Sequence, residues 1–125
     1  MLSALGGIGA DSDPLVIEAD DSLLRQAIDN LVRNAVRRAT RVELVVREDN
    51  RDALIEVNDD GPGFPPDLIG QVFERFRKGD TDRDGTGLGL AIVRAIAEAH
   101  GGTVSAENRA EGGASLQLRI PRPRA

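Results

Sequence analysis

The feature that most constrains this chain is a change of hydrophobic period near residue 40. Between residues 23 and 36 apolar residues recur at spacings of three and four, which indicates one α-helix, capped by Asp20, Asp21 or Ser22 and ending near Ala39. From Val42 onward apolar and polar residues alternate, as in a strand with one buried face. Such a chain must pack helices against a sheet. The apolar helix positions are Leu23, Leu24, Ala27, Ile28, Leu31, Val32, Ala35 and Val36.

Turn and breaker residues divide the rest of the chain into short elements. Asp49-Asn50-Arg51-Asp52 is typical of a hairpin turn, and Gly101-Gly102 ends a second long helix. We therefore expect an α/β (α+β) fold, a two-layer sandwich in which about three helices cover one face of a mixed β-sheet. The predicted elements are a strand at 15–17, a hairpin over 42–58, a short helix over 66–73, a helix over 88–99, and strands at 103–107 and 116–120 around Gly112-Gly113. The domain spans 15–121, with a loose lead-in over 1–14 and a tail over 122–125.

The composition excludes several classes of function. The 125 residues are enough for one domain with a core, and no apolar run is long enough to span a bilayer. The absence of cysteine rules out disulfides, thiolate nucleophiles and cysteine-ligated zinc. A net charge of −5 argues against nucleic acid as a partner, because nucleic-acid binding needs a basic surface.

Three glycines at alternate positions form the most distinctive motif, Gly85-Thr86-Gly87-Leu88-Gly89-Leu90. A bare backbone can approach a polyphosphate and direct its N–H groups at it, and the following helix adds the positive end of its dipole. The motif lacks the Lys-Ser/Thr ending of a P-loop, and its spacing is not that of a dinucleotide fingerprint. Taken alone, it is a weak indication of a phosphate site.

Two polar motifs lie at the ends of other elements. Asn30 and Asn34 share one helix face, and an asparagine oxygen can occupy one position of an octahedral Mg²⁺ shell, although buried amides satisfied by the backbone would show the same spacing. A carboxylate of the Asp59-Asp60 pair, at the end of a strand, could accept a hydrogen bond from the exocyclic amine of adenine, which guanine lacks at that position. Gly61 and Gly63 would let a flat base approach the backbone, but an acidic β-turn also explains this segment.

Aromatic and basic residues gather in one further stretch. Phe73 and Phe76 could anchor the loop that follows them or simply pack locally. Arg75, Arg77 and Lys78 supply positive charge that the acidic chain otherwise lacks, although a solvated loop is the usual fate of such a run.

The order of these four motifs resembles the ATP-binding catalytic domain of sensor histidine kinases, over about residues 15–121. Its superfamily includes Hsp90, type II topoisomerases and mismatch-repair ATPases, and the resemblance implies the Bergerat fold with ATP and Mg²⁺ as cofactors. It implies that Asn34 binds Mg²⁺, that Asp59 recognises adenine, and that Arg75 or Lys78 neutralises phosphate charge. The other residues implied at the ATP site are Asn30, Arg37, Arg38, Gly61, Gly63, Phe73, Phe76, Gly85, Thr86, Gly87, Leu88, Gly89 and Leu90.

Some positions depart from this family's pattern. Arg38 stands where an aromatic residue is common, and its guanidinium could stack on the base instead. Ala114 follows Gly113 where the family often has Gly-Thr, so no hydroxyl is available there. His100 is the one histidine of the chain, and it ends a predicted helix, where an imidazolium suits the helix dipole; we do not expect it to be catalytic.

The residue four positions before Asn34 bears on the type of reaction. The ATPase branches and the related anti-sigma serine kinases have a glutamate base there, whereas Asn30 cannot take a proton at neutral pH, which favours transfer to an outside nucleophile. The resemblance therefore implies a monomeric cytoplasmic kinase domain of a membrane-anchored parent protein. Its acceptor histidine lies on a separate dimerisation domain, and a response regulator acts downstream. A nucleotide-sensing module without catalysis and a hydrolysing ATPase remain open as alternatives.

Overall fold

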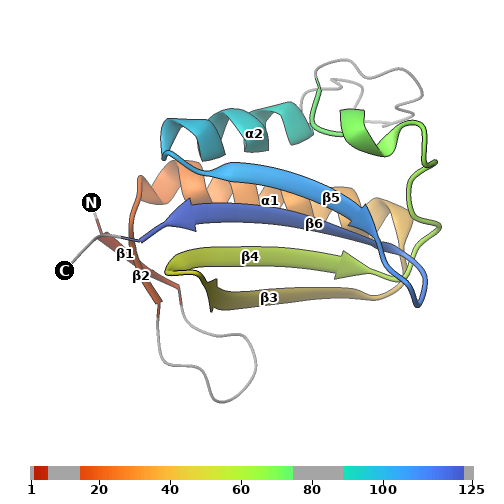
Figure 1. Cartoon of the computed structure of the whole chain (residues 1–125), viewed down its shortest axis with the longest axis horizontal. Helices are drawn as coiled ribbons and strands as arrows, with labels where there is room; N and C mark the ends of the chain where they lie inside the picture. Colours follow the sequence, from red (N-terminus) through yellow and green to blue (C-terminus); the bar gives the residue numbers. More distant parts are fainter. Residues whose placement is uncertain (1, 6–14, 75–88, 123–125) are drawn as a thin grey trace.

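A computed structural model of the chain describes residues 2–5, 15–74 and 89–122. Its main layer is a four-stranded sheet with the strand order β3-β4-β6-β5, and two α-helices lie against one face of it (Figure 1). This arrangement confirms the predicted two-layer α/β sandwich. The strands of this sheet are β3 (Val42–Asp49), β4 (Asp52–Asp59), β5 (Thr103–Asn108) and β6 (Ala114–Pro121). The helices are α1 (Asp21–Arg38) and α2 (Gly89–Ala99), with a 3₁₀ turn, η1 (Ile69–Gln71), before α2.

Helix α1 forms where the apolar period predicts it. The carboxylate of Asp20 accepts a hydrogen bond from Leu23 N at 3.1 Å and caps the helix. Leu23 and Val36, at the two ends of the predicted apolar stripe, are 37% and 59% exposed and lie outside the core. The α1 residues buried in the core are Leu24, Ala27, Leu31 and Ala35.

The expectation of a mixed sheet is wrong, because every neighbouring pair of strands in the four-stranded sheet is antiparallel. The crossover from β4 through α2 to β5 does make β4 and β5 run in the same direction. Strand β6 then lies between them and pairs with both, so the two parallel strands are not neighbours. Hydrophobic alternation sets which face of each strand is buried, but it carries no information on strand order.

The β3–β4 hairpin turns at Asn50 and Arg51, as predicted. Both residues have positive φ, 52° and 72°. This backbone is that of a type I′ turn, whose twist matches the twist of the two strands that it joins. The strands extend to residues 49 and 52 on either side of the turn, and β4 ends at residue 59, one residue beyond the predicted hairpin over 42–58.

The short helix predicted over 66–73 is reduced to η1. Leu68 and Ile69 donate backbone hydrogen bonds to Pro65 O, and Gln71 donates to Leu68 O. Most of these bonds span three residues, which is the 3₁₀ pattern. Gly70 lies in the middle of this segment, and a glycine in a helix interior is about 1 kcal/mol less favourable than an alanine.

The loose lead-in predicted for residues 1–14 is wrong for residues 2–5. Strand β1 (Leu2–Leu5) pairs antiparallel with β2 (Leu15–Glu18), with residue 2 opposite residue 18. Strand β2 confirms the strand predicted at 15–17. Pairing between backbones does not require a strong sequence pattern on both strands, which is why composition alone did not indicate β1.

His100 joins the end of α2 to the start of α1. Its Nδ1 lies 2.7 Å from Ile96 O, and its Nε2 accepts a hydrogen bond from Asp20 N at 3.0 Å. Nε2 acts as the acceptor in this geometry, so the ring bridges the end of α2 and the start of α1 and has a structural role.

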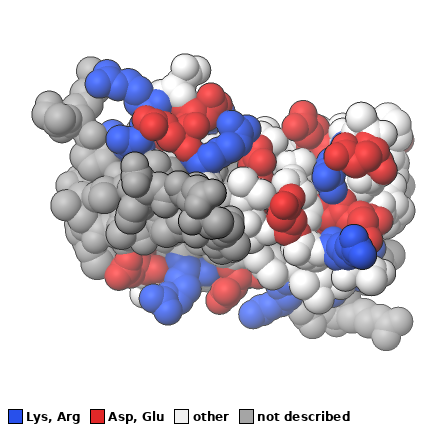
Figure 2. Space-filling view, turned by 90° about the horizontal axis from the view of Figure 1, so that it is seen from below, with Lys and Arg blue, Asp and Glu red and all other residues white. Residues whose placement is uncertain are grey.

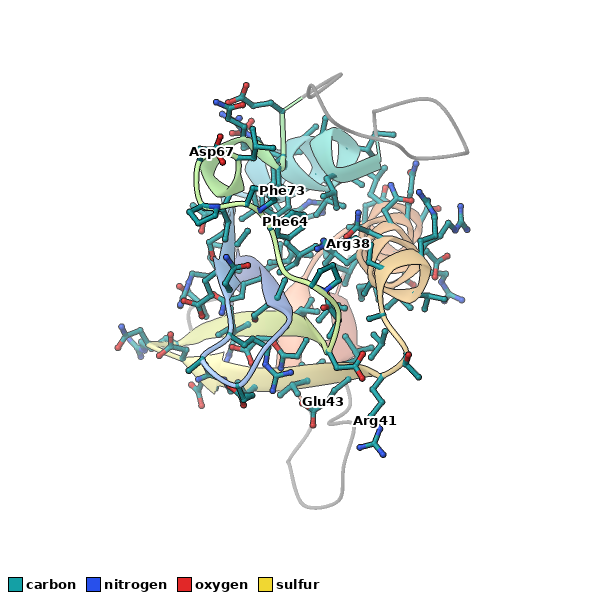
Figure 3. All side chains as sticks on the ribbon, turned by 90° about the vertical axis from the view of Figure 1, so that its right-hand side faces the viewer. Arg38, Arg41, Glu43, Phe64, Asp67 and Phe73 are labelled. Carbon is teal, nitrogen blue, oxygen red and sulfur yellow. The ribbon has the colours of Figure 1, made fainter. Side chains whose placement is uncertain are left out.

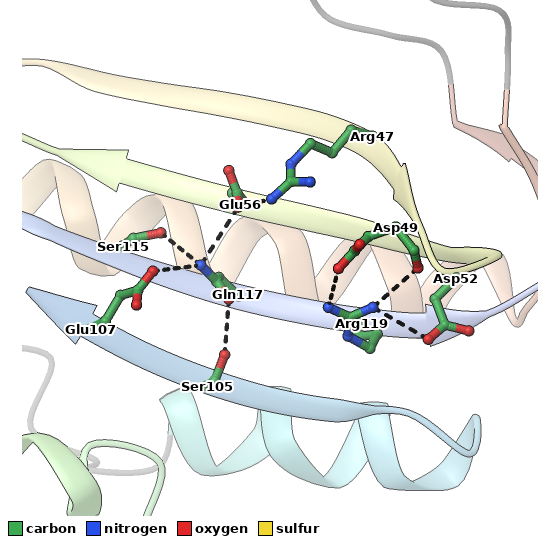
Figure 4. A network of polar contacts seen from close by, with 9 residues as sticks. All are labelled: Arg47, Asp49, Asp52, Glu56, Ser105, Glu107, Ser115, Gln117 and Arg119. Atoms are coloured by element: carbon green, nitrogen blue, oxygen red, sulfur yellow. Dashed lines mark hydrogen bonds and ion pairs between the residues drawn. The ribbon is translucent and has the colours of Figure 1, made fainter. Parts of the chain in front are cut away.

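The face of the sheet away from the helices is polar. Gln117 on β6 contacts Glu107 and Ser105 on β5 at 3.1 and 3.0 Å (Figure 4). Arg119 pairs with Asp49 at 2.6 Å and with Asp52 at 3.3 Å, and its hydrogen bond holds the pKa of Asp49 below the ordinary value. These contacts link all four strands of the sheet across its solvent side.

Acidic and basic side chains are interspersed on the described part of the surface that Figure 2 shows. Over residues 15–74 and 89–122, no helix combines the length and the apolarity needed to cross a bilayer.

Candidate functional site

The carboxylate of Asp59 is buried at the end of β4, and 1% of the residue is exposed. It continues the inward row formed by residues 53, 55 and 57, because strand side chains alternate between the two faces. Its Oδ1 accepts hydrogen bonds from Gly61 N at 2.9 Å and from Ala114 N at 3.2 Å. Among the described residues both bonds end on the same oxygen, which leaves Oδ2 to accept a hydrogen bond from a ligand.

Asp60, the next residue, has a different role. Its Oδ1 accepts hydrogen bonds from Thr40 N at 2.9 Å and Arg41 N at 2.8 Å. These bonds hold the pKa of Asp60 below its ordinary value of 3.8, and the bond from Arg41 has the largest effect. Asp60 therefore ties the end of β4 to the α1–β3 connection, and Asp59 remains the candidate for ligand recognition.

Gly61 and Gly63 are closely packed against other parts of the chain. A Cβ on Gly61 would lie 2.6 Å from Arg38 O. A Cβ on Gly63, where φ is +76°, would lie 2.7 Å from Asn108 Oδ1. The sequence suggested that these glycines admit a flat base, whereas the close approaches observed are made by α1 and the β5–β6 hairpin.

Asn30, Asn34 and Arg38 form a row on one side of α1, because four residues are close to one helical turn. At one end of the row, Asn30 Nδ2 donates a hydrogen bond to Gly89 O, at the first residue of α2, at 3.1 Å. At the other end, Arg38 Nη2 donates to Gly63 O at 2.7 Å. Asn34 therefore lies between the start of α2 and the loop after Asp59, about 6 Å along the helix axis from each neighbour in the row.

The Oδ1 atom of Asn34 is buried and has no hydrogen-bond partner among the described residues. A buried amide oxygen without a partner costs about 1–3 kcal/mol, so its presence needs an explanation. A neutral amide oxygen is a ligand that Mg²⁺ accepts alongside phosphate oxygens and water. The atom fits a magnesium site that is shared with a phosphate ligand.

The guanidinium of Arg38 lies over the ring of Phe64, 3.7 Å from its centroid. Figure 3 shows the Arg38 side chain reaching from α1 toward that ring, with Phe73 close by. Phe64 is 6% exposed, and Phe73 is also part of the core. The structure therefore stacks Arg38 on an aromatic ring of the protein itself, and it gives Phe73 the packing role that was one of its two predicted roles.

The start of α2 contacts Asn30. Gly89 is the first residue of this helix, and Leu90 is partly buried against the core. Arg37, in the last turn of α1, is exposed, and the structure does not place it in the row with Asn34. The predicted site residues that lie outside the described part of the chain are Arg75, Phe76, Lys78, Gly85, Thr86, Gly87 and Leu88.

Two side chains that the sequence analysis missed hold the loop after Asp59. Asn108 Oδ1 accepts a hydrogen bond from Phe64 N, and Asn108 Nδ2 donates one to Phe64 O, both at 2.8 Å. Arg109 Nη1 donates to Asp59 O at 3.1 Å. In the sequence these residues precede Glu111-Gly112-Gly113 and indicate only a turn, so no local signal could have revealed their partners.

These groups converge on the helix side of the sheet. The buried carboxylate suits an exocyclic amine, the unpaired amide oxygen suits a hard cation, and the N-terminus of α2 suits a phosphate. This combination can hold an adenine nucleotide together with a metal ion.

Comparison with known proteins agrees with this chemistry. Residues 19–124 match a family model described as histidine kinase-, DNA gyrase B- and HSP90-like ATPase. The sensor-type histidine kinase PrrB of Mycobacterium leprae is 48% identical over 103 residues, covering 80% of this chain and 23% of PrrB. The chain spans between 13% and 23% of the length of the curated relatives compared with it.

Two solved structures share the fold closely. The mycobacterial sensor histidine kinase MprB superposes with a TM-score of 0.79 at 31% identity, covering 89% of this chain and 80% of that one. The ATP-binding domain of PrrB from Mycobacterium tuberculosis superposes with a TM-score of 0.75 at 38% identity, covering 92% of this chain and 78% of that one.

Proposed function

The chain belongs to the histidine kinase-, DNA gyrase B- and HSP90-like ATPase family, and from this we propose that it is the ATP-binding catalytic domain of a sensor histidine kinase. In this function it binds Mg-ATP and presents the γ-phosphoryl group to a histidine on a separate dimerisation domain. The observation that carries the proposal is the buried Oδ1 of Asn34, which has no partner among the described residues. A cation bound together with a nucleotide would supply that partner.

Each end of the site has its own part in this proposal. Asp59 accepts a hydrogen bond from the exocyclic amine of adenine through Oδ2, while Oδ1 stays bonded to the backbone. Asn34 holds Mg²⁺, which when bound neutralises negative charge on the phosphates. Backbone N–H groups at Gly89 and Leu90 face the phosphates at the start of α2. As expected from the sequence, we assign the remaining phosphate contacts to Arg37, to Arg75 or Lys78, and to the glycines at 85 and 87.

The chemistry of Asn30 supports phosphoryl transfer over hydrolysis. Its amide cannot take a proton from water at neutral pH, and its Nδ2 is already bonded to Gly89 O. A hydrolysing ATPase would need another base to activate water. The contribution of this chain to transfer is then positioning of the nucleotide and neutralisation of its charge.

The partners follow from this function and from the relatives. We infer a dimerisation domain of the same parent protein that carries the acceptor histidine, and a response regulator downstream. The parent protein is anchored in the cell membrane, with this monomeric domain on the cytoplasmic side.

The adenine assignment is tested by the substitution Asp59→Asn. The amide oxygen can still accept from Gly61 N and Ala114 N, so the fold should survive, but an NH₂ group now faces the base. Hydrogen bonds to charged groups contribute about 1.5–3 kcal/mol, so ATP affinity should fall about 10- to 100-fold and the preference for ATP over GTP should narrow. Isothermal titration calorimetry is the suitable assay, because the chain has no Trp or Tyr. Unchanged ATP affinity with intact ATP/GTP selectivity would refute the assignment.

A further inference from the structure

The loop after Asp59 is held by a side chain from a distant part of the chain. Asn108, at the end of β5, bonds both the N–H and the C=O of Phe64 at 2.8 Å. The two residues are 44 positions apart in sequence. An amide side chain that bonds both polar groups of one residue acts as a substitute for a neighbouring strand, and it satisfies backbone groups that no regular element pairs.

Gly63 makes this contact possible. A Cβ at this position would lie 2.7 Å from Asn108 Oδ1, and the φ of +76° is one that side-chain-bearing residues rarely adopt. The side chain of Asn108 therefore occupies the space that a side chain at position 63 would need. This is a geometric reason for a glycine at 63 that involves no ligand.

The opposite side of the loop is held by α1. Arg38 donates a hydrogen bond to Gly63 O at 2.7 Å, and its guanidinium stacks on the Phe64 ring. Residues 63 and 64 are therefore fixed between α1 on one side and the β5–β6 hairpin on the other. A segment fixed on both sides has little freedom to shift relative to the sheet.

The same hairpin also reaches the carboxylate itself. Arg109 Nη1 donates to Asp59 O at 3.1 Å, and Ala114 N donates to Asp59 Oδ1 at 3.2 Å. The β5–β6 hairpin thus contacts both ends of the segment from Asp59 to Phe64. Asn108 thus holds one end of the segment whose other end carries the carboxylate of Asp59.

We propose that Asn108 is a positioning residue for nucleobase recognition, which acts by fixing the segment 59–64 and with it the carboxylate of Asp59. The inference rests on the proposed function, because it assumes that Asp59 faces adenine. Asn108 makes no contact with the ligand in this account. It sets the geometry in which a charged acceptor meets a single exocyclic amine, and a misplacement of about 1 Å is enough to weaken such a bond.

The test compares three variants by calorimetric titration with ATP and with GTP. Asn108→Ala removes both hydrogen bonds to Phe64, and Asn108→Asp keeps the acceptor for Phe64 N but replaces the donor to Phe64 O. Arg119→Ala is the matched control, because it removes polar contacts of β6 about 16 Å along the strand from Ala114. Arg119 is drawn in Figure 4, on the outer face of the sheet.

We expect Asn108→Ala to lower ATP affinity about 5- to 10-fold, which is the range for one hydrogen bond, and to lower GTP affinity less. The ATP/GTP ratio should therefore fall in Asn108→Ala, and at least as far in Asn108→Asp, because its second carboxylate oxygen would face Phe64 O where the amide donated, while Arg119→Ala lowers the melting temperature but keeps the wild-type ratio. If Asn108→Ala does not fold, Asn108→Asp carries the same test. A wild-type ATP/GTP ratio in a folded Asn108 variant, or an equal fall of the ratio in Arg119→Ala, overturns the inference. A wild-type chain that binds no ATP refutes the proposed function instead.

Discussion

Replacing Asn34 with leucine should stabilise the ligand-free chain and remove its magnesium-dependent affinity for ATP. The buried Oδ1 has no partner among the described residues, and such an atom costs about 1–3 kcal/mol. Leucine has the same branching at Cγ, has no polar atom, and is the better helix former by about 0.4 kcal/mol. We expect a net gain of about 1–2 kcal/mol in the free energy of unfolding.

Asn30 is the matched control for this substitution. It lies on the same side of the same helix, but its Nδ2 donates to Gly89 O at 3.1 Å. Leucine at this position loses that hydrogen bond and leaves the carbonyl without its donor, at a net cost of about 0.5–1 kcal/mol after the gain in helix propensity. The same chemical change should therefore have opposite signs at two positions one turn apart.

Thermal unfolding followed by far-UV circular dichroism, without nucleotide or magnesium, measures both effects. For a chain of 125 residues, 1 kcal/mol corresponds to about 4 °C in melting temperature. Asn34→Leu should melt about 4–8 °C above the wild type, and Asn30→Leu about 2–4 °C below it. A melting temperature of Asn34→Leu at or below that of the wild type would refute the reasoning. So would a magnesium-dependent ATP affinity that survives in this variant.

Two further predictions concern the backbone and the acid range. Gly113→Ala should lower the free energy of unfolding by at least about 3 kcal/mol, because φ is +90° there and the new Cβ would lie 1.8 Å from Asp59 O. Gly112→Ala should lower it by only about 1 kcal/mol, because φ is +105° but the space around the new Cβ is open. Equal denaturation midpoints of the two variants would contradict this prediction. Asp60 has a lowered pKa, so its contribution to stability is present above its ordinary pKa of 3.8 and is lost as the pH falls through its lower folded value. Urea unfolding between pH 6 and pH 3 should show a smaller acid loss in Asp60→Asn than in the wild type, and parallel curves would argue against the role of its bonds to the α1–β3 connection.

The sequence predicts the local elements well, because their causes are local. The apolar period of α1, its cap at Asp20 and the turn at Asn50 and Arg51 all follow from residues within a few positions of one another. The burial of Asp59 also follows from alternation along β4. The order of the strands does not, because it depends on where β6 enters the sheet.

The candidate site was predictable in its residue types and not in its contacts. Asn34 and Asp59 could be singled out because amide and carboxylate oxygens have defined ligand chemistry. Arg38 stacks on Phe64 from 26 positions away in the sequence, and Asn108 bonds the backbone of Phe64 from 44 positions away. No periodicity connects these residues. The packing of Gly61 and Gly63 against the chain itself was missed for the same reason.

The central claim, that this chain presents ATP to a histidine on another domain, is tested most directly by phosphoryl transfer. The chain is incubated with γ-labelled ATP and magnesium, alone and with the dimerisation domain of its own parent protein. The account predicts label on a histidine of the dimerisation domain, less label when the chain carries Asp59→Asn, and none on the chain alone, including His100. Label on the chain alone would contradict the account, as would an unlabelled dimerisation domain in a mixture where the chain binds ATP.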